Sequence, residues 1–494
     1  MTDEHRYRMF IDGERCDAAD GASFTSVDPT TEAPWARIPD ATADDVDRAV
    51  MAAHRAFESG PWPRLSAAER GRHLRGLAER IAPIAETLAR TETKDTGKLL
   101  RETSWQAANL AKVYEYYAGL ADKVHGEVPP AGGGATMSVV VREPVGVVAA
   151  VVPWNSQLHL AAYKIAPALA AGNTMVMKAS EDASAALLEF AAAVEASDLP
   201  EGVFNLVTGG GAPCGQALVS HPLVRRVSFT GGVETARRII SATSNNIAKM
   251  SLELGGKSPV VVYDDADIES ATNGAVAGIF GASGQSCAAG SRLIAHESIH
   301  DELVGRLAER AGAIRVGDPM DADTDMGPLA TSRQRERIES LLEKSVARGA
   351  KVVAGGGRPA GRDRGYFFEP TIVECDHQDY EVVRQELFGP VLSVLKFRDE
   401  DEAIALANDS DYAFAGGVFT RDIAKAMRTA QAVRAGRFWV NTYRTTSAGV
   451  PFGGFKNSGY GRESGIDAIR DYTETKGIII DTSGQPVADP FIMR

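Results

Sequence analysis

The stretch VGVVAAVVPWNSQLHLAAYKIAPALAAGNTMVMKAS, residues 145–180, decides the fold. It opens with a β-branched run from Val147 to Val152, and a second apolar run extends from Thr174 to Met177. Between them lies a helical pattern that begins near Leu158. Buried runs joined by a helix are typical of neighbouring parallel strands. The stretch therefore predicts a strand, helix, strand unit of a parallel sheet.

The same alternation continues along the chain. Further strands are predicted at Val203 to Val207, Val227 to Phe229 and Met250 to Leu254. Upstream, helical patterns dominate, because apolar residues recur at helical spacing from Ala43 to Glu58 and from Ala67 to Thr93. The fold class expected from these patterns is α/β.

Composition limits the kind of protein this is. A chain of 494 residues exceeds what one hydrophobic core usually supports, so we expect two or three structural units. Hydrophobic residues make up 44% and charged residues 24%, the balance of a soluble globular protein. The formal net charge of -13 argues against nucleic acid or an anionic membrane as a partner, because both require clustered positive charge.

The N-terminus and the cysteines indicate a compartment. Residues 1–8 are polar and lack the apolar core of a secretory signal, and no long uncharged apolar run appears. The cysteines, at positions 16, 214, 287 and 375, show no paired spacing, so we expect neither a disulfide framework nor a metal site. We therefore expect a cytoplasmic protein.

Cys287 and Glu253 are distinctive because small residues surround each of them. Cys287 lies in GQSCAAGSR, residues 284–292, and Glu253 opens ELGGK, residues 253–257. A thiolate can bond covalently to an electrophilic carbon, and a carboxylate can activate the water that later releases the product. Small neighbours allow a close backbone approach and an amide directed at an oxyanion. The alternative is that Cys287 is a small buried hydrophobe.

Motifs along nearly the whole chain resemble those of the aldehyde dehydrogenase superfamily, in its NAD(P)-dependent, hydrolytic, non-acylating branch. Its nucleophile motif Gly-Gln-x-Cys and its general-base motif Glu-Leu-Gly-Gly-Lys are both intact. The other matching motifs, in family order, are Asp95-Thr96-Gly97-Lys98, Pro153-Trp154-Asn155, Lys178-Ala179-Ser180-Glu181, Phe229-Thr230-Gly231-Gly232, Glu386-Leu387-Phe388-Gly389-Pro390, Asn441, Pro451-Phe452-Gly453-Gly454-Phe455-Lys456 and Ser458-Gly459-Tyr460-Gly461-Arg462-Glu463. So many motifs in one order leave little room for coincidence.

The resemblance implies an aldehyde dehydrogenase-like fold with a Rossmann-type cofactor domain, an α/β catalytic domain and a small β oligomerisation extension. The expected boundaries are 1–123 and 143–254 for the NAD-binding domain, 255–457 for the catalytic domain, 124–142 and 472–485 for the extension, and 486–494 for a C-terminal tail. The active site would lie between the two domains. We expect a homodimer or homotetramer, with the tail either docked over a neighbouring subunit's tunnel mouth or disordered.

The expected cofactor is NAD. In parallel α/β sheets ligands bind beyond the carboxyl ends of the strands, and a helix that opens near Gly232 offers N–H groups to a pyrophosphate. The resemblance places Lys178 and Glu181 on the adenosine ribose, and Glu386 and Phe388 on the nicotinamide ribose and ring. A carboxylate on the ribose repels a 2′-phosphate, which favours NAD over NADP.

The pyrophosphate site is less well defined. Gly209, Gly211 and Gly215 miss the usual Gly-x-Gly-x-x-Gly spacing, and Gly232 and Ala236 stand where other residues are common in the family. The candidate cofactor-binding residues are Val152, Pro153, Trp154, Lys178, Ser180, Glu181, Gly211, Gly215, Phe229, Thr230, Gly231, Gly232, Leu254, Gly255, Glu386 and Phe388.

The resemblance also implies catalytic roles. Cys287 adds to the aldehyde, the Asn155 amide and the Cys287 N–H hold the oxyanion, and Glu253 activates water to hydrolyse the thioester. Lys164 and Glu463 match the family's proton relay. Each residue has an ordinary alternative: Asn155 as a helix cap, Glu253 as a surface charge, Lys164 as a solvated lysine, and Glu463 as a turn residue.

The substrate is an aldehyde of undetermined structure. The positions that resemble the family's tunnel wall are Ser156, His159, Tyr163, Arg444 and Phe452, which together predict a fairly polar wall. Arg444 either pairs with a carboxylate on a semialdehyde or is a solvated loop residue or an intersubunit contact.

Two further functional classes stay open at this stage. One is acyl transfer to coenzyme A, and the other is a non-catalytic structural protein that retains the fold. The intact Cys287, Glu253 and Asn155 favour hydrolytic aldehyde oxidation over both.

Overall fold

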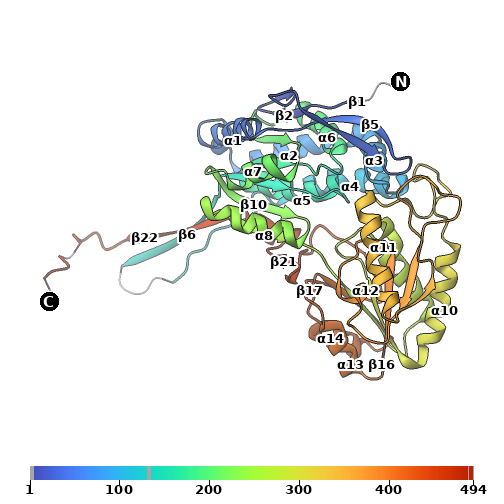
Figure 1. Cartoon of the computed structure of the whole chain (residues 1–494). Helices are drawn as coiled ribbons and strands as arrows, with labels where there is room; N and C mark the ends of the chain where they lie inside the picture. The colour runs from blue at the N-terminus through green and yellow to red at the C-terminus, as the bar shows by residue number, and fades with distance from the viewer. Residues whose placement is uncertain (1–4, 131–134, 488, 493–494) are drawn as a thin grey trace.

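The structure is a computed structural model that describes residues 5–130, 135–487 and 489–492. Two open sheets form its two main parts, and a two-stranded arm projects from them (Figure 1). In Figure 1 the first sheet and its helices lie at the top, the second sheet lies at the lower right, and the arm extends to the left with the C-terminus beyond it.

The first sheet has eight strands, in the spatial order β21, β11, β10, β7, β8, β9, β2, β3. The middle five are parallel, and the edge strands β21, β2 and β3 pair in antiparallel fashion. The strands are β21 (Gly459–Tyr460), β11 (Lys249–Glu253), β10 (Val224–Thr230), β7 (Val147–Val151), β8 (Thr174–Lys178), β9 (Phe204–Val207), β2 (Met9–Ile11) and β3 (Glu14–Cys16). The five predicted strands are thus confirmed, with ends shifted by a few residues.

Helices cover both faces of this sheet. Val147 and Ala149 of β7 pack into the core on one side, and Val148 and Ala150 pack into the core on the other, as the alternation of side chains along a strand requires. The first face carries α1 (Ala43–Glu58), α7 (Gln216–Ser220) and α8 (Val233–Ala242). The second carries α2 (Ala67–Ile81), α3 (Ala85–Thr96), α4 (Leu100–Leu120), α5 (Gln157–Ala171) and α6 (Ala185–Glu195).

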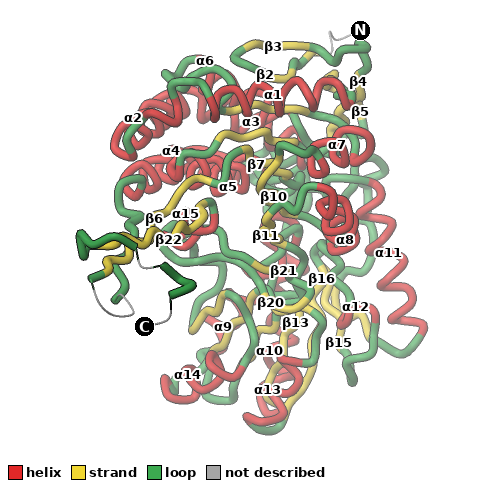
Figure 2. The backbone as a smooth tube through the Cα atoms, turned by 90° about the vertical axis from the view of Figure 1, so that its left-hand side faces the viewer, coloured by secondary structure: helices red, strands yellow, loops and turns green. Residues whose placement is uncertain are grey.

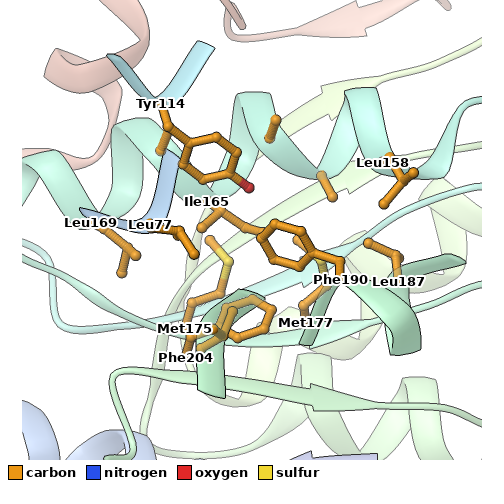
Figure 3. Packing of buried hydrophobic residues seen from close by; sticks show 14 of the residues in the cluster. Leu77, Tyr114, Leu158, Ile165, Leu169, Met175, Met177, Leu187, Phe190 and Phe204 are labelled. Atoms are coloured by element: carbon orange, nitrogen blue, oxygen red, sulfur yellow. The ribbon is translucent and has the colours of Figure 1, made fainter. Parts of the chain in front are cut away.

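The core on the second face is rich in aromatic and sulfur-containing side chains. Tyr114 of α4 stacks on Phe190 of α6 with ring centroids 6.0 Å apart, and Met175 and Met177 of β8 lie beneath them (Figure 3). This packing fixes α5, which carries Lys164, against the sheet.

Two predictions about the N-terminal part are wrong in detail. The helix expected from Ala67 to Thr93 is two helices, α2 and α3, separated by a 3₁₀ turn at Ala82–Ile84. Pro83 explains the break, since proline has no N–H and its ring crowds the preceding turn. The first part is also less helical than predicted, because β1 (His5–Arg6), β5 (Ala33–Pro39) and β4 (Ser23–Asp28) form a three-stranded sheet.

The second sheet has seven strands, in the order β14, β15, β16, β13, β12, β18, β19, all parallel except β14. They are β14 (Lys351–Ala354), β15 (Thr371–Glu374), β16 (Val391–Phe397), β13 (Arg292–His296), β12 (Pro259–Val262), β18 (Ala415–Phe419) and β19 (Arg437–Val440). One face packs on α9 (Ile268–Phe280) and α10 (Glu297–Ala313). The other packs on α11 (Ser332–Ala347), α12 (Glu381–Arg384), α13 (Glu400–Asn408) and α14 (Ile423–Ala432).

The arm consists of β6 (Thr136–Pro144) and β22 (Thr473–Asp481), paired in antiparallel fashion along their whole length (Figure 2). These strands overlap the two segments, 124–142 and 472–485, that were expected to form the extension, although β6 continues to Pro144. Several apolar side chains of the arm are exposed, namely Met137, Ile478, Ile479 and Ile480, with Ile479 79% exposed. Residues 131–134 of the extension and 488, 493 and 494 of the tail lie outside the described residues. Across the described ranges, none of the helices is both long and apolar enough to cross a membrane.

Candidate active site

Cys287 lies in a backbone loop between a 3₁₀ turn at Gly281–Gly284 and β13. Ala282, Ser283 and Gly284 precede it with φ angles of +53°, +53° and +72°. Left-handed backbone at non-glycine residues is strained, and it persists where the surroundings hold it. Here the Ser283 hydroxyl donates to the Gly327 carbonyl at 2.9 Å, which anchors the loop.

Asn155 follows β7 directly and points toward the same loop. Its side-chain N–H donates to the carbonyl of Gln285 at 2.9 Å. It does not cap α5, because Ser156 occupies the N-cap position and no side chain bonds there. An amide nitrogen carries two N–H groups, so one remains for a ligand oxygen.

Glu253 ends β11 and is 1% exposed, so the surface-charge alternative is wrong. Neither carboxyl oxygen has a hydrogen-bond partner within the described part of the chain. Burial raises the pKa of this carboxyl well above its ordinary value, and the charge of Glu463 raises it further. The group therefore holds a proton to a higher pH than an ordinary glutamate.

Lys164 and Glu463 form an ion pair that is almost fully buried. Lys164 also donates to the Ser228 hydroxyl at 3.0 Å. Glu463 is fixed by two backbone hydrogen bonds that it exchanges with Phe452, at 2.6 and 2.7 Å. A solvated lysine and a simple turn residue are therefore both excluded as descriptions of this pair.

The two glycines of the ELGGK segment allow a close approach of three elements. A Cβ on Gly256 would lie 2.3 Å from the Cys287 carbonyl oxygen, and one on Gly255 would lie 2.1 Å from a Glu386 carboxyl oxygen. The Gly256 N–H donates to Glu386 at 2.8 Å. Burial raises the pKa of Glu386 to about 7.

Cys287 opens into a cavity of about 630 Å³, which we call the reaction cavity. Asn155 and Glu463 also line it, and so do all five predicted tunnel residues, Ser156, His159, Tyr163, Arg444 and Phe452. The wall is more aromatic than predicted, because Trp105 and Trp439 join Tyr163 and Phe452. Lys98, Glu102, Gln106 and Arg437 are further lining residues that were not predicted. Of these only Lys98 belongs to a family-like motif, so only Lys98 carried a detectable signal.

Two pKa shifts define the chemistry of the reaction cavity. Burial raises the pKa of the Cys287 thiol, and the nearby Glu253 and Glu386 charges raise it further. The thiol must therefore give up a proton before it attacks. Burial lowers the pKa of His159 to about 4, so its ring is neutral near pH 7.

A second cavity, of about 1020 Å³, lies beyond the carboxyl ends of the strands of the first sheet; we call it the cofactor cleft. It is lined by twelve of the predicted cofactor residues, Val152, Pro153, Trp154, Lys178, Ser180, Glu181, Gly211, Gly215, Phe229, Thr230, Gly231 and Gly232. The other four lie beside it: Leu254 and Gly255 follow β11, Glu386 bonds Gly256, and the Phe388 ring lies edge-on to that of Trp154, with centroids 5.4 Å apart.

The cofactor cleft fits a dinucleotide. Lys178 and Glu181 pair at 3.1 Å, and Arg333 and Asp182 pair at 2.7 Å, so the cleft offers both donors and acceptors. The Thr230 hydroxyl is buried and has no hydrogen-bond partner in the described residues. No side chain caps α8 at Gly232, which leaves its first N–H groups for an anion. Asp182, Arg238 and Arg333 also line the cleft and were not predicted.

Cys16, Cys214, Cys287 and Cys375 are all free thiols. Within residues 5–130, 135–487 and 489–492, no group of His, Cys, Asp and Glu side chains is arranged to hold a metal ion.

Comparisons with known proteins show what the whole chain is similar to. The model of the aldehyde dehydrogenase family matches residues 16–478. The chain is 50% identical over 490 residues to a (Z)-2-((N-methylformamido)methylene)-5-hydroxybutyrolactone dehydrogenase of Acinetobacter baylyi, covering 99% of this chain and 100% of that one. It is 41% identical over 476 residues to a betaine aldehyde dehydrogenase of Bacillus subtilis, covering 96% and 97%. A crystal structure of betaine aldehyde dehydrogenase from Staphylococcus aureus in complex with NAD+ superposes with a TM-score of 0.95 at 41% identity, covering 97% and 96%.

Proposed function

The chain belongs to the aldehyde dehydrogenase family and is an NAD-dependent aldehyde dehydrogenase, and from this premise we propose that Cys287 is its nucleophile. The observation that carries the proposal is the convergence of three segments far apart in the sequence. The Cys287 loop, Asn155 and Glu463 line one cavity, and the buried Glu253 opens the segment whose Gly256 packs against the Cys287 carbonyl.

The first step is addition of Cys287 to the aldehyde. The Cys287 thiol releases its proton to water, the sulfur bonds to the carbonyl carbon, and the carbonyl oxygen becomes an alkoxide that accepts hydrogen bonds from the free N–H of Asn155 and the backbone N–H of Cys287. The chemistry that NAD supplies when bound is acceptance of a hydride from that carbon. The carbon is then held on the sulfur as a thioester.

The second step is hydrolysis. Glu253 takes a proton from water, the resulting hydroxide adds to the thioester carbon, and the carbon–sulfur bond breaks to give the carboxylic acid and the Cys287 thiolate. The orphaned carboxyl oxygens of Glu253 leave it free to accept this proton. Lys164 and Glu463, buried beside it, are proposed to carry the proton onward.

NAD is proposed to lie in the cofactor cleft. Lys178 and Glu181 would hold the adenosine ribose, the N-terminus of α8 the pyrophosphate, and Glu386 and Phe388 the nicotinamide riboside. The domain boundaries proposed from the sequence place this cleft and Cys287 on different domains.

The assembly proposed is a homodimer or homotetramer joined through the arm, since the exposed isoleucines of β22 need a cover. We also propose that the enzyme works in the cytoplasm, because a reactive thiol needs a reducing compartment.

The names of the relatives indicate substrates that differ in charge. Betaine aldehyde carries a quaternary ammonium group, whereas a 5-hydroxybutyrolactone is the ring-closed isomer of an aldehyde acid. The proposal therefore covers the reacting aldehyde group and stops there. The side chains that line the reaction cavity determine which remainder of the substrate binds.

NADH formation with a panel of aldehydes, with and without coenzyme A, tests this function. We expect turnover without coenzyme A. Strict dependence on coenzyme A would indicate acyl transfer, which the buried Glu253 argues against. Absence of NADH with every aldehyde would indicate a non-catalytic protein.

A further inference from the structure

Arg437 is a buried cation in the wall of the reaction cavity. It opens β19, is 8% exposed and lies over the ring of Phe452 at 5.0 Å. Its Nη2 donates to the Val450 carbonyl at 2.8 Å and to the Pro451 carbonyl at 3.4 Å. Its Nε is buried and has no hydrogen-bond partner among the described residues.

No carboxylate of the described residues forms an ion pair with Arg437. A guanidinium stays protonated even where burial lowers its pKa, as burial does here. A buried charge without a counterion is strongly unfavourable, so such residues usually have a partner or await one.

Two other basic residues of the reaction cavity have carboxylate partners. Lys98 lies 3.6 Å from the buried Glu92, and Arg101 lies 3.7 Å from Asp325. Arg444 donates to the Gly281 carbonyl at 2.7 Å, beside the residue whose N–H binds Glu102. Arg444 therefore has a carbonyl partner, and it is less buried than Arg437.

We infer that the reaction cavity selects aldehydes that carry a carboxylate, and that Arg437 binds this carboxylate. The inference rests on the proposed function. A guanidinium has five N–H groups; Nη2 serves the Val450 and Pro451 carbonyls and Nε is buried, which leaves the N–H groups of Nη1 for a carboxylate. Tyr163, buried beside the same wall, places an aromatic face along the carbon chain of the substrate. A quaternary ammonium aldehyde would instead meet a second positive charge.

The test compares three aldehydes, 4-oxobutanoate, butanal and betaine aldehyde, by kcat/KM for NADH formation. We expect the wild-type enzyme to prefer 4-oxobutanoate to butanal at least about tenfold, as one charge-assisted hydrogen bond provides, and to use betaine aldehyde least. Arg437→Gln retains a donor for the Val450 carbonyl while it removes the charge. It should reduce the preference for 4-oxobutanoate over butanal by about ten- to a hundredfold, and Arg437→Lys should restore part of it.

Arg444→Gln is the matched control, since it removes a guanidinium from the same cavity. If this variant loses the preference and Arg437→Gln keeps it, the assignment to Arg437 is wrong. Equal use of 4-oxobutanoate and butanal by the wild-type enzyme, or a preference for betaine aldehyde, overturns the inference and leaves aldehyde oxidation intact.

A binding measurement separates this inference from the proposed function. Succinate resembles the carboxylate end of the probe and does not turn over. It should raise the Tm of the wild-type protein in a concentration-dependent way and leave the Tm of Arg437→Gln unchanged. An equal response of both proteins contradicts the anion site, even if no aldehyde in the panel yields NADH.

Discussion

Residues 152–154 line the cofactor cleft and Asn155 and Ser156 line the reaction cavity, so one short segment borders both, yet the two cavities differ in their charged groups. In the cofactor cleft, Lys178 pairs with Glu181 at 3.1 Å and Arg333 pairs with Asp182 at 2.7 Å. In the reaction cavity and beside it, Arg437 and Glu253 are buried with orphaned polar atoms. Ion-paired side chains are suited to hold a ligand in place. Buried side chains without a partner have shifted proton affinities and remain available to a substrate or a proton. Substitutions in the reaction cavity should therefore affect turnover. Substitutions in the cofactor cleft should affect the affinity for the cofactor.

The largest difference is expected for Cys287→Ala. Removing the sulfur removes the covalent intermediate, so NADH formation should fall by at least about a thousandfold. Because Cys287 lies outside the cofactor cleft, NAD should bind with unchanged affinity in a titration of intrinsic fluorescence. Turnover at the wild-type rate would exclude the covalent route.

Asn155→Ala should produce the next largest loss. One oxyanion donor disappears, and kcat should fall about a hundred- to a thousandfold with a smaller change in KM. Asn155→Asp, which keeps the size and removes the N–H groups, is the matched control. An increase in KM with no change in kcat would show that the only role of Asn155 is its hydrogen bond to the Gln285 carbonyl.

In the cofactor cleft, Glu181→Gln should have a moderate effect that is confined to the cofactor. Loss of one charge-assisted hydrogen bond should raise KM for NAD about tenfold with little change in kcat. Use of NADP relative to NAD should increase, since the repulsion of a 2′-phosphate is gone. Initial rates with both cofactors measure this, and a fall in kcat alone would contradict the contrast between the cavities.

The smallest effect concerns stability. Burial raises the pKa of Glu253, so stability is greatest below the unfolded-state pKa and falls as the pH rises through the folded-state value. Glu253→Gln removes this titration, and its Tm should exceed that of the wild-type protein by roughly 1 to 3 °C at about pH 9 and by less at about pH 5. Melting curves at both pH values measure it, and a lower Tm for the variant at the higher pH would show that Glu253 is not destabilising.

Local patterns predicted the parallel strands well, because a buried strand must be apolar along its whole length. They missed the break at Pro83, which one residue imposes on an otherwise regular helical pattern. In the site, Cys287, Glu253 and Asn155 were recognisable by their motifs. Arg437 was not, since its segment is typical of a strand and only tertiary packing brings it against Phe452. Trp105 of α4 and Trp439 of β19 line the same wall. The two residues are far apart in the sequence, and sequence spacing does not reveal such contacts.

The most direct test of the covalent mechanism is rapid mixing of Glu253→Gln with an aldehyde and NAD, followed by acid quenching and peptide mass spectrometry. The account predicts a burst of about one NADH per active site, slow turnover afterwards, and an acyl adduct on the peptide that contains Cys287. Turnover at the wild-type rate with no burst, and no added mass on Cys287, would contradict it.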